Sequence, residues 1–518
     1  MPETGFNLLD VPLIRADRGA FSLPEVMARL CRGEIGSFPA LRHHQAPAWH
    51  AFLVQLAFHA LEAAERDTLP ADPEEWRAVL RRLGGDWPQD DPWCLVAPRE
   101  RPAFLQPAVP GGALDPFKNR VETPDELDLL VTSKNHDLKA ARMVRAAPDD
   151  WLFALVSLQT QEGQMGRGNY GIARMNGGYG SRPFLGIAPQ GGFGARFSRD
   201  LELLRREAGR LWQAEWSGWG TRRDLRLLWL ESWDGTKQLT PDELHPLFIE
   251  ICRRVRLESD REGRLFARLA NSEAARIKAK DLKGVTPDPW APIETGSETK
   301  LLSLTGEGFS WRRMRALLFS ESFKRPPLAR VAAADKSPIE IVAAGLARGQ
   351  GKTEGFHERH IPVPPKARGV LQSEAARLAK TAELQAIDAG TMARSVLRSA
   401  ILCAFEKGAK RVNFDAREAA RAAEPYMQLF DAAVDAAFFP ALWDSVEAGP
   451  EAAARKWQEI LRKEAETVFA KALEAGPQAQ ERRFIAAARA RGLFDGLMFK
   501  NFPALRPSRA DREDDDDQ

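Results

Sequence analysis

The C-terminal part of the chain places the strongest constraint on the fold, because its helical pattern is long and regular. Between residues 376 and 505, alanine-rich stretches carry apolar residues at the three- and four-residue spacing of an amphipathic helix. Four such stretches occur, at 381–407, 414–447, 450–475 and 478–498. The links between them are short and contain Gly408, Gly449 with Pro450, and Gly476 with Pro477. Helices joined by short links pack as antiparallel neighbours, so the pattern predicts a four-helix bundle.

The first 375 residues are mixed in character. Helical spacing and capping residues predict helices at 24–30, 47–66, 74–84 and 149–162. Strand-like apolar content occurs at 5–14, 223–233, 248–257 and, as short antiparallel strands, 285–305. The expected fold class is therefore α+β. A large mixed α/β domain with irregular loops (1–375) is followed by the four-helix bundle (376–505) and an acidic tail (506–518) expected to be disordered.

Composition limits the classes of function. The 518 residues include 74 Lys and Arg against 72 Asp and Glu, so any surface that binds nucleic acid must be local. The four cysteines lie far apart, which argues against a zinc finger and fits a reducing compartment. The N-terminus has no signal-peptide pattern, and no apolar stretch approaches the ~20 residues of a membrane span. We expect a cytoplasmic protein with no membrane partner.

The local basic surface is expected at residues 163–199. This window holds eleven glycines and five arginines, with no Asp or Glu. Glycine lets the backbone approach a ligand closely, and arginine supplies donors shaped for phosphates and base edges. The window predicts a loop that presses its backbone against a polyanion; the alternative is a flexible glycine-rich loop with solvated arginines. Residues 116–145 and 345–368 are two further basic loops.

The search for catalytic motifs gives a negative result. Residues 339–353 look like a strand followed by a phosphate-binding loop. However, the Walker pattern needs glycine at the position of Leu346 and a helix after its lysine, whereas Lys352 is followed by Glu354, Gly355 and soon Pro362. No HExxH or GxSxG motif occurs. We expect no enzyme activity, cofactor or metal; the alternative is a nucleotide-binding enzyme that uses 345–353.

Several short elements, in order along nearly the whole chain, carry a family resemblance. The opening FNLLDVPLIRA is followed by SLPEV, and RPAFLQP lies at 101–107. LLVTSKNHDLK (129–139) precedes the helix FALVSLQTQE and NGGYG (176–180), and GLARGQGKTEGFHERH lies at 345–360. The bundle contains FFPALWD followed by a long Ala/Arg helix. In this order the elements resemble the CasA-type large subunit of the type I-E CRISPR Cascade complex.

The resemblance implies a DNA-recognition subunit and not an enzyme. In that family the subunit recognises the protospacer-adjacent motif (PAM) of duplex DNA, mainly from the minor groove. It promotes strand separation, so that the guide RNA can pair and form an R-loop, and it helps to recruit an effector nuclease-helicase. The implied partners are the other Cascade subunits, CRISPR RNA, target double-stranded DNA and the nuclease-helicase. A transposition-associated CRISPR adaptor with the same fold is the other alternative.

The resemblance also assigns residues. Those expected to bind the motif are Asn176, Gly177, Gly178, Tyr179, Gly180, Lys300, Gln350 and Gly351. Gln350 is the expected strand-separating wedge. Contacts with the DNA or RNA backbone, or with the RNA 5′ end, are expected from Thr132, Ser133, Lys134, Asn135, Arg182, Arg348 and Lys352. The cysteine cluster of some family members is absent, so no zinc is assigned there.

The physical chemistry agrees with these roles. A minor groove is narrow, so its reader needs glycine backbone or a slim side chain such as lysine or glutamine. Minor-groove readout is degenerate, which predicts a permissive motif of a few bases. Specificity over the full target then comes from base pairing with the guide.

Overall fold

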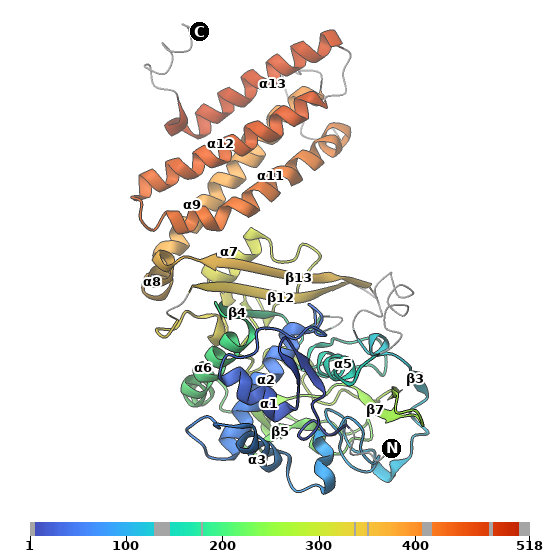
Figure 1. Ribbon diagram of the computed structural model, residues 1–518. Helices are drawn as coiled ribbons and strands as arrows, with labels where there is room; N and C mark the ends of the chain where they lie inside the picture. The colour runs from blue at the N-terminus through green and yellow to red at the C-terminus, as the bar shows by residue number, and fades with distance from the viewer. Residues whose placement is uncertain are drawn as a thin grey trace. The chain divides into compact units, whose positions relative to one another are not determined.

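The computed structural model describes residues 6–128, 146–177, 180–335, 338–349, 352–406, 417–475 and 480–506. The chain divides into two compact units (Figure 1). Unit 1 comprises Met1–Phe309 and Glu321–Pro362, and unit 2 comprises Ser310–Ser320 and Val363–Gln518. Unit 2 therefore takes one short segment from the middle of the chain in addition to the C-terminal residues.

The helices of unit 1 in the described residues are α1 (Leu23–Cys31), α2 (Ala46–Ala63), α3 (Pro73–Gly84), α5 (Pro148–Gln161) and α6 (Gly192–Glu215). The first four begin within one residue of the start that the sequence predicts, whereas α6 is not predicted and begins inside the window 163–199 that was expected to form a loop. At the start of α1 the backbone N–H of Ser22 donates to Glu25 Oε2 at 2.7 Å, as expected of a capping box. At α3 the backbone N–H of Glu75 donates to Asp72 Oδ1 at 2.9 Å.

Helix α2 is the centre of the unit 1 core. Every residue from Pro47 to Leu61 is buried, and α2 contacts α3, α5, α6 and strand β6 (Leu244–Ile249). Trp49 stacks on Phe52, with ring centroids 5.7 Å apart, and meets the edge of Phe153 at 5.1 Å. A helix that is buried on all sides can form only where other elements surround it, so α2 organises the packing of unit 1.

In the part of unit 1 that the structure describes, the strands form five small sheets. Neighbouring strands in these sheets are β1 (Ile14–Ala16) with β2 (Gly19–Phe21); β3 (Asn119–Val121), β8 (Leu265–Ala270) and β7 (Arg254–Ser259); β5 (Leu225–Leu227) with β6; β10 (Thr299–Leu301), β9 (Ile293–Thr295) and β11 (Phe323–Lys324); and β13 (Lys352–Val363), β12 (Ile339–Gly349) and β4 (Phe184–Pro189). Strands β5 and β6 pair in parallel, whereas β1 with β2, β3 with β8, β7 with β8, β9 with β10 and β11, and β4 with β12 pair antiparallel. Short 3-10 turns join the elements at Pro88–Trp93, Pro110–Gly112, Pro124–Glu126, Leu228–Leu230, Pro241–Glu243, Lys280–Leu282 and Pro327–Ala329.

Three strand predictions are wrong in extent. Residues 5–14 contribute only Ile14 to a strand, because Asn7 forms a turn in which its Oδ1 accepts the N–H of Leu9 at 2.9 Å. The stretch 223–233 contains the short β5 followed by a 3-10 turn. The stretch 248–257 contains the end of β6 and the start of β7. The break between them occurs where Gln159 Oε1 accepts the N–H groups of Cys252 and Arg253, at 2.9 and 2.8 Å, in place of a neighbouring strand.

Unit 2 is helical in the residues that the structure describes. Its elements are α7 (Trp311–Phe319), α8 (Pro365–Ser373), α9 (Ala375–Thr391), a π-helical turn (Met392–Leu397), α10 (Arg398–Phe405), α11 (Arg417–Asp444), α12 (Pro450–Glu474), α13 (Gln480–Asn501) and a 3-10 turn (Pro503–Leu505). Helices α9 and α10 continue through the π turn, so four long helical segments pack together, as the sequence predicts. The expected α+β class with a C-terminal helical region is confirmed. Residues 507–518 of the expected tail lie outside the described residues.

Aromatic side chains from different helices meet in the core of unit 2. Phe438 stacks on Trp311 with ring centroids 4.7 Å apart and meets Trp457 edge-on at 5.9 Å. Phe469 stacks on Phe494 at 4.8 Å. These contacts join α7, α11, α12 and α13, so the middle-of-chain helix α7 packs as part of this unit. None of the helices in the described residues is long and apolar enough to cross a membrane.

A buried histidine makes the stability of unit 1 pH-dependent. His50 Nε2 lies 2.8 Å from Asp200 Oδ2, and burial, with Arg196 and Arg199 nearby, lowers the pKa of His50 to about 4. An unfolded histidine titrates near pH ~6.5, so the unfolded chain binds more protons in the window between these values. We predict that the thermal unfolding midpoint falls as the pH drops from about 7.5 to about 5, and that His50→Gln flattens this slope. An unchanged slope in the variant contradicts the assignment.

Candidate nucleic-acid interface

Buried arginines hold both ends of the glycine loop, which we define as residues 175–181. At one end Arg174 Nη1 pairs with Glu250 Oε1 at 2.8 Å, and its Nη2 donates to the carbonyl oxygen of Phe248 at 2.9 Å. At the other end Arg182 donates to both oxygens of Asp288, at 2.6 and 2.9 Å. Asp288 Oδ2 also lies 3.6 Å from Arg174 Nε, so one carboxylate connects the two ends.

The two buried carboxyls respond differently to their surroundings. Burial acts to raise the pKa of Asp288, but Arg182 and Arg174 together outweigh it and leave that pKa below its usual value. Burial also acts on Glu250, and here it exceeds the effect of Arg174, so the pKa of Glu250 is raised. Asp288 is therefore the more strongly held anion of this network.

Gly177 of the glycine loop is accessible between these fixed ends. Gly177 is exposed and has a φ of 56°, a conformation that favours glycine. Asn176 Nδ2 donates to Ser303 Oγ at 3.3 Å, and Gly180 N–H donates to the Gly177 carbonyl at 3.4 Å. Ser181 Oγ donates to the carbonyl of Leu346 on β12 at 2.9 Å. The loop thus lies beside the segment after β10 and beside β12.

Lys300 lies in the β9–β10 hairpin, where the N–H of the next residue, Leu301, donates to the carbonyl oxygen of Lys283 at 3.0 Å. Lys300 is on β10, opposite Glu294 of β9, and its Nζ lies 3.8 Å from Glu294 Oε2. Just beside this hairpin, Gly284 lies so close to Met175 that an added Cβ would sit 2.6 Å from the Met175 carbonyl carbon. A long, partly exposed ion pair contributes little to stability, so Lys300 can exchange Glu294 for a phosphate or a base edge.

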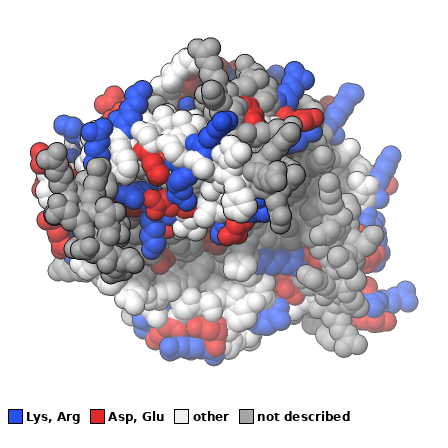
Figure 2. All heavy atoms as spheres, turned by 90° about the horizontal axis from the view of Figure 1, so that it is seen from above, with Lys and Arg blue, Asp and Glu red and all other residues white. Residues whose placement is uncertain are grey.

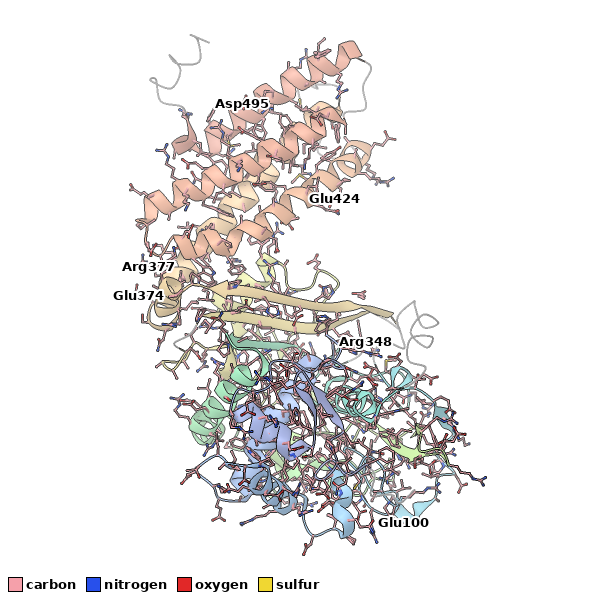
Figure 3. The ribbon with its side chains drawn as sticks, in the orientation of Figure 1. Glu100, Arg348, Glu374, Arg377, Glu424 and Asp495 are labelled. Carbon is pink, nitrogen blue, oxygen red and sulfur yellow. The ribbon has the colours of Figure 1, made fainter. Side chains whose placement is uncertain are left out.

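The pair of long strands β12 and β13 also lies beside the glycine loop and the segment after β10. Gly308 has a φ of 61°, and a Cβ there would lie 2.4 Å from His357 Nδ1, so the segment after β10 presses on β13. Arg348 lies near the end of β12 (Figure 3). Burial lowers its pKa, and the carboxylate of Glu162 opposes that change. The glycine loop, the β9–β10 hairpin and the β12–β13 pair therefore converge within unit 1.

The expected role of Arg182 in contacting phosphates is corrected by the structure. Its side chain is 1 % exposed, its Nε and Nη2 both donate to Asp288, and its guanidinium lies over the rings of Phe184 and Trp290. Releasing it would leave Asp288 with only the more distant Arg174 as a charged partner. Arg182 therefore positions the glycine loop and is not available to a nucleic acid.

The wider expectation for residues 163–199 is also corrected. Of the five arginines in the window only Arg167 is exposed; Arg199, for example, pairs with Asp335 and Asp200 at 2.8 Å each. The end of the window, from Gly192, is the first turns of α6. Most arginines of the window thus belong to an interior ion-pair network and are neither solvated nor placed to bind a polyanion, whereas the glycine backbone at Gly177 is accessible. On the face shown in Figure 2, acidic and basic side chains are interspersed.

Several assigned positions lie outside the described residues: Thr132, Ser133, Lys134, Asn135, Gly178, Tyr179, Gln350 and Gly351. The strands on either side of Gln350 and Gly351 are described, and Lys352 begins β13. A strand after this lysine confirms the rejection of the Walker motif, which needs a helix N-terminus there. The buried acids Asp288 and Glu250 were missed by the sequence analysis. Their only local signal is the Asp288 carboxylate accepting the N–H of Trp290 at 3.0 Å, as in many Asx turns.

Comparisons with known proteins give a fold. No family model matches the chain, and no curated protein sequence matches it. The structure is similar to CasA (Cse1) of Thermus thermophilus, with a TM-score of 0.64 and 18 % identity over 96 % of this chain and 100 % of the other. It is similar to the CRISPR-associated protein Cse1 of Acidimicrobium ferrooxidans (TM-score 0.65, 17 % identity, 98 % and 100 % covered). It is also similar to Cse1 of Thermobifida fusca, with a TM-score of 0.60 and 16 % identity over 98 % of this chain and 100 % of the other. The chain has the fold of the CasA (Cse1) proteins along nearly its whole length, which confirms the resemblance at that level.

The network around Asp288 predicts the effect of removing one charge. Asp288→Asn leaves Arg182 buried without its anion, which should destabilise unit 1 by about 3 kcal/mol. It should also increase amide hydrogen exchange in peptides that cover residues 174–182. The matched control is Asp281→Asn, an exposed aspartate of the same segment, which should change the stability by less than about 0.5 kcal/mol. Urea unfolding and exchange mass spectrometry measure both effects; equal exchange in the two variants contradicts the role of Asp288.

Proposed function

We propose that this chain is the large subunit of a type I-E Cascade complex and recognises the protospacer-adjacent motif in target duplex DNA. Its fold, shared with the CasA (Cse1) proteins over nearly the whole chain, supports this role. The observation that carries the proposal is the convergence of the glycine loop, Lys300 and the β12–β13 pair in unit 1. These segments are far apart in sequence and unrelated in local structure.

The glycine loop is proposed to enter the minor groove. Gly177 presents backbone without a side chain, and Asn176 carries an amide that can donate to or accept from base edges. Gly178, Tyr179 and Gly180 are proposed to contact the motif as well. Lys300 contributes a slim cation to the same groove, where the edges of A·T pairs offer only acceptors. The fixed ends at Arg174 and Arg182 limit the conformational entropy that the loop loses on binding.

Strand separation is assigned to Gln350. It lies between β12 and β13, strands of 11 and 12 residues, with Gly351 beside it. The glutamine inserts beside the base stack next to the motif and offers donors and acceptors to the bases that it parts. Arg348 and Lys352 supply positive charge on either side of it. Opening the first step costs on the order of 1.4 kcal/mol of stacking, after which pairing with the guide is nearly balanced.

The remaining assignments follow from the same role. Residues Thr132, Ser133, Lys134 and Asn135 contact the nucleic-acid backbone or the 5′ end of the CRISPR RNA. Unit 2 contacts other Cascade subunits or the displaced strand, and the complex recruits a nuclease-helicase that degrades the target in the cytoplasm. The chain itself performs no chemistry.

The proposal is tested by assembling Cascade with and without this chain. A library of duplex targets with randomised bases beside a fixed guide-matched sequence is presented to each complex, and the bound DNA is sequenced. We expect enrichment of a motif of a few bases only when the chain is present. Equal selection by both complexes, or no selection by either, contradicts the proposal.

The side chain of Lys300 is expected to matter for discrimination. Lys300→Ala should reduce the preference for the motif over a mismatched duplex by roughly tenfold, which corresponds to about 1.4 kcal/mol. Lys237→Ala, at an exposed position of unit 1, is the matched control. Equilibrium binding of the assembled complex to both duplexes measures the ratio. If Lys300→Ala weakens binding to the motif duplex and to the mismatched duplex equally, Lys300 binds phosphate and does not read bases.

The wedge assignment predicts a kinetic defect that can be rescued. Gln350→Ala should leave assembly and initial motif binding intact but slow R-loop formation on linear duplex. Negative supercoiling, or a bubble pre-opened beside the motif, should restore the rate because each supplies the opening energy. Gln238→Ala, an exposed glutamine of unit 1, is the control. A wild-type rate on linear duplex, or a failure of the bubble to rescue, shows that Gln350 is not the wedge.

A further inference from the structure

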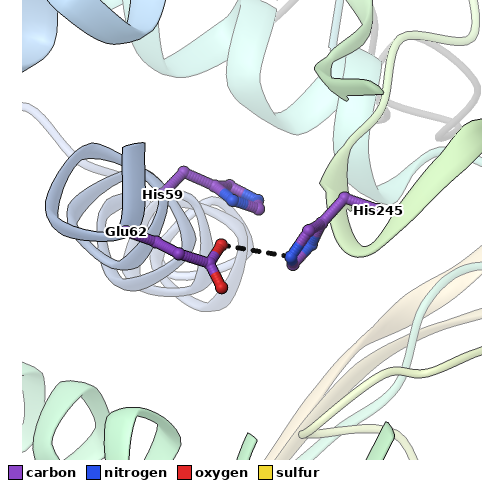
Figure 4. A group of neighbouring side chains, drawn as sticks. All are labelled: His59, Glu62 and His245. Carbon is purple, nitrogen blue, oxygen red and sulfur yellow. Dashed lines mark ion pairs between the residues drawn. The ribbon is translucent and has the colours of Figure 1, made fainter. Parts of the chain in front are cut away.

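A group of metal-ligating side chains lies in unit 1 and has no part in the proposed DNA contacts. His59 and Glu62 are three residues apart on α2 and therefore share a helix face, and His245 faces them from β6 (Figure 4). One ligand atom of each residue lies within 4.8 Å of the others. Among the described residues, this is the one group of three His, Cys, Asp or Glu side chains whose ligand atoms lie close enough together to share a metal ion.

The hydrogen bonds of His59 leave one of its ring nitrogens available. His59 Nε2 donates to the carbonyl oxygen of Leu247 at 3.0 Å, which fixes its proton on Nε2. Its Nδ1 then carries a lone pair, is buried, and has no hydrogen-bond partner among the described residues. Buried polar atoms rarely lack a bonding partner. The lone pair on Nδ1 can therefore be satisfied by an electron-pair acceptor such as a metal ion.

The other two groups are already close. His245 Nε2 lies 3.2 Å from Glu62 Oε2, and the rings of His59 and His245 meet edge to face with centroids 4.7 Å apart. Ligand atoms at the edges of a zinc tetrahedron are separated by roughly 3.3 Å, given metal–ligand distances of about 2.0–2.1 Å. The nitrogen–oxygen separation therefore already suits a shared ion.

We propose that His59, Glu62 and His245 bind a divalent transition-metal ion of the zinc class, with water as a fourth ligand. Two imidazoles and one carboxylate are a common ligand set for such ions. The Glu62 side chain is 38 % exposed, which leaves a path for the ion and a position for the water.

The Leu247 backbone supports this site from behind. It accepts from His59 Nε2, and such a second contact orients a ligating histidine and fixes its tautomer. Gln55 Nε2 donates to the same carbonyl at 2.8 Å and holds it in place. The ion joins residues 59–62 to residue 245, and so ties the central helix α2 to the parallel β5–β6 pair.

Two existing contacts compete with the ion. Arg226 Nη1 lies 2.9 Å from the same Glu62 oxygen that His245 approaches. The N–H of Leu247 donates to His245 Nδ1 at 3.0 Å, so binding through Nε2 moves the ring proton to Nδ1 and gives up that bond. The Arg226 guanidinium repels a cation, so removing this charge should increase the affinity of the site for a metal ion. If the Arg226–Glu62 ion pair has only a structural role, removing Arg226 should not increase that affinity.

The experiment uses the full chain, stripped of metal with a chelator and titrated with Zn²⁺ in a calorimeter. We expect one ion per chain, and binding at least tenfold weaker in Glu62→Gln, which keeps the size of the side chain. Arg226→Met should bind several-fold more tightly. His43→Ala, which removes a histidine that is 94 % exposed, is the control for adventitious surface binding and should not change the titration.

A spectroscopic measurement separates coordination from a change in folding. Co²⁺ bound to the wild-type chain should show the intense visible bands of a four-coordinate nitrogen–oxygen site, and Glu62→Gln should lose them. Zn²⁺ should also raise the thermal unfolding midpoint of the wild-type chain and not that of Glu62→Gln. The proposal is overturned if no ion binds, if Glu62→Gln binds as tightly as wild type, or if His43→Ala abolishes binding.

Discussion

The carboxylate of Asp288 is the contact on which the candidate interface depends. It lies in the interior of unit 1, where an unpaired charge is strongly unfavourable, and it is stabilised by Arg182 and, at a longer distance, Arg174. These arginines stand immediately before and after the glycine loop. A single buried anion thus sets the distance between the loop ends, while Gly177 in the middle stays exposed. A fixed frame with an accessible glycine centre suits a surface that must approach a narrow groove without a large loss of entropy.

The same network explains where reasoning from the sequence succeeds and where it fails. Helices were predictable because their signals are local: the Ser22–Glu25 capping box and the Asp72 cap lie within one turn of the residues that they stabilise. The arginine-rich window was misread because its acidic partners are distant. Arg174 and Glu250 are 76 residues apart, and Arg182 and Asp288 are 106 apart. A window without acids therefore indicates only that the charges are not balanced locally.

The residues of the candidate nucleic-acid interface differ in how far the sequence alone predicts their position and their role. The convergence of Asn176 with the β10 segment depends on tertiary packing, and no periodicity in the sequence reports it. The role proposed for Gln350 rests on family resemblance alone, because a glutamine between glycines is otherwise typical of an ordinary polar loop. The structure adds that long strands, β12 and β13, lie on either side of it. The Walker motif could be rejected from sequence because its requirement for a following helix is local.

Photocrosslinking tests most directly whether the converged segments read the motif. Duplex DNA with a photoreactive base at each motif position in turn is bound by the assembled complex, irradiated, and analysed by mass spectrometry of the crosslinked peptides. The account predicts crosslinks from the motif to peptides that contain residues 176–180 and Lys300, with the base beside the motif reaching Gln350. Crosslinks from the motif that fall only in unit 2, or on another subunit, would contradict it.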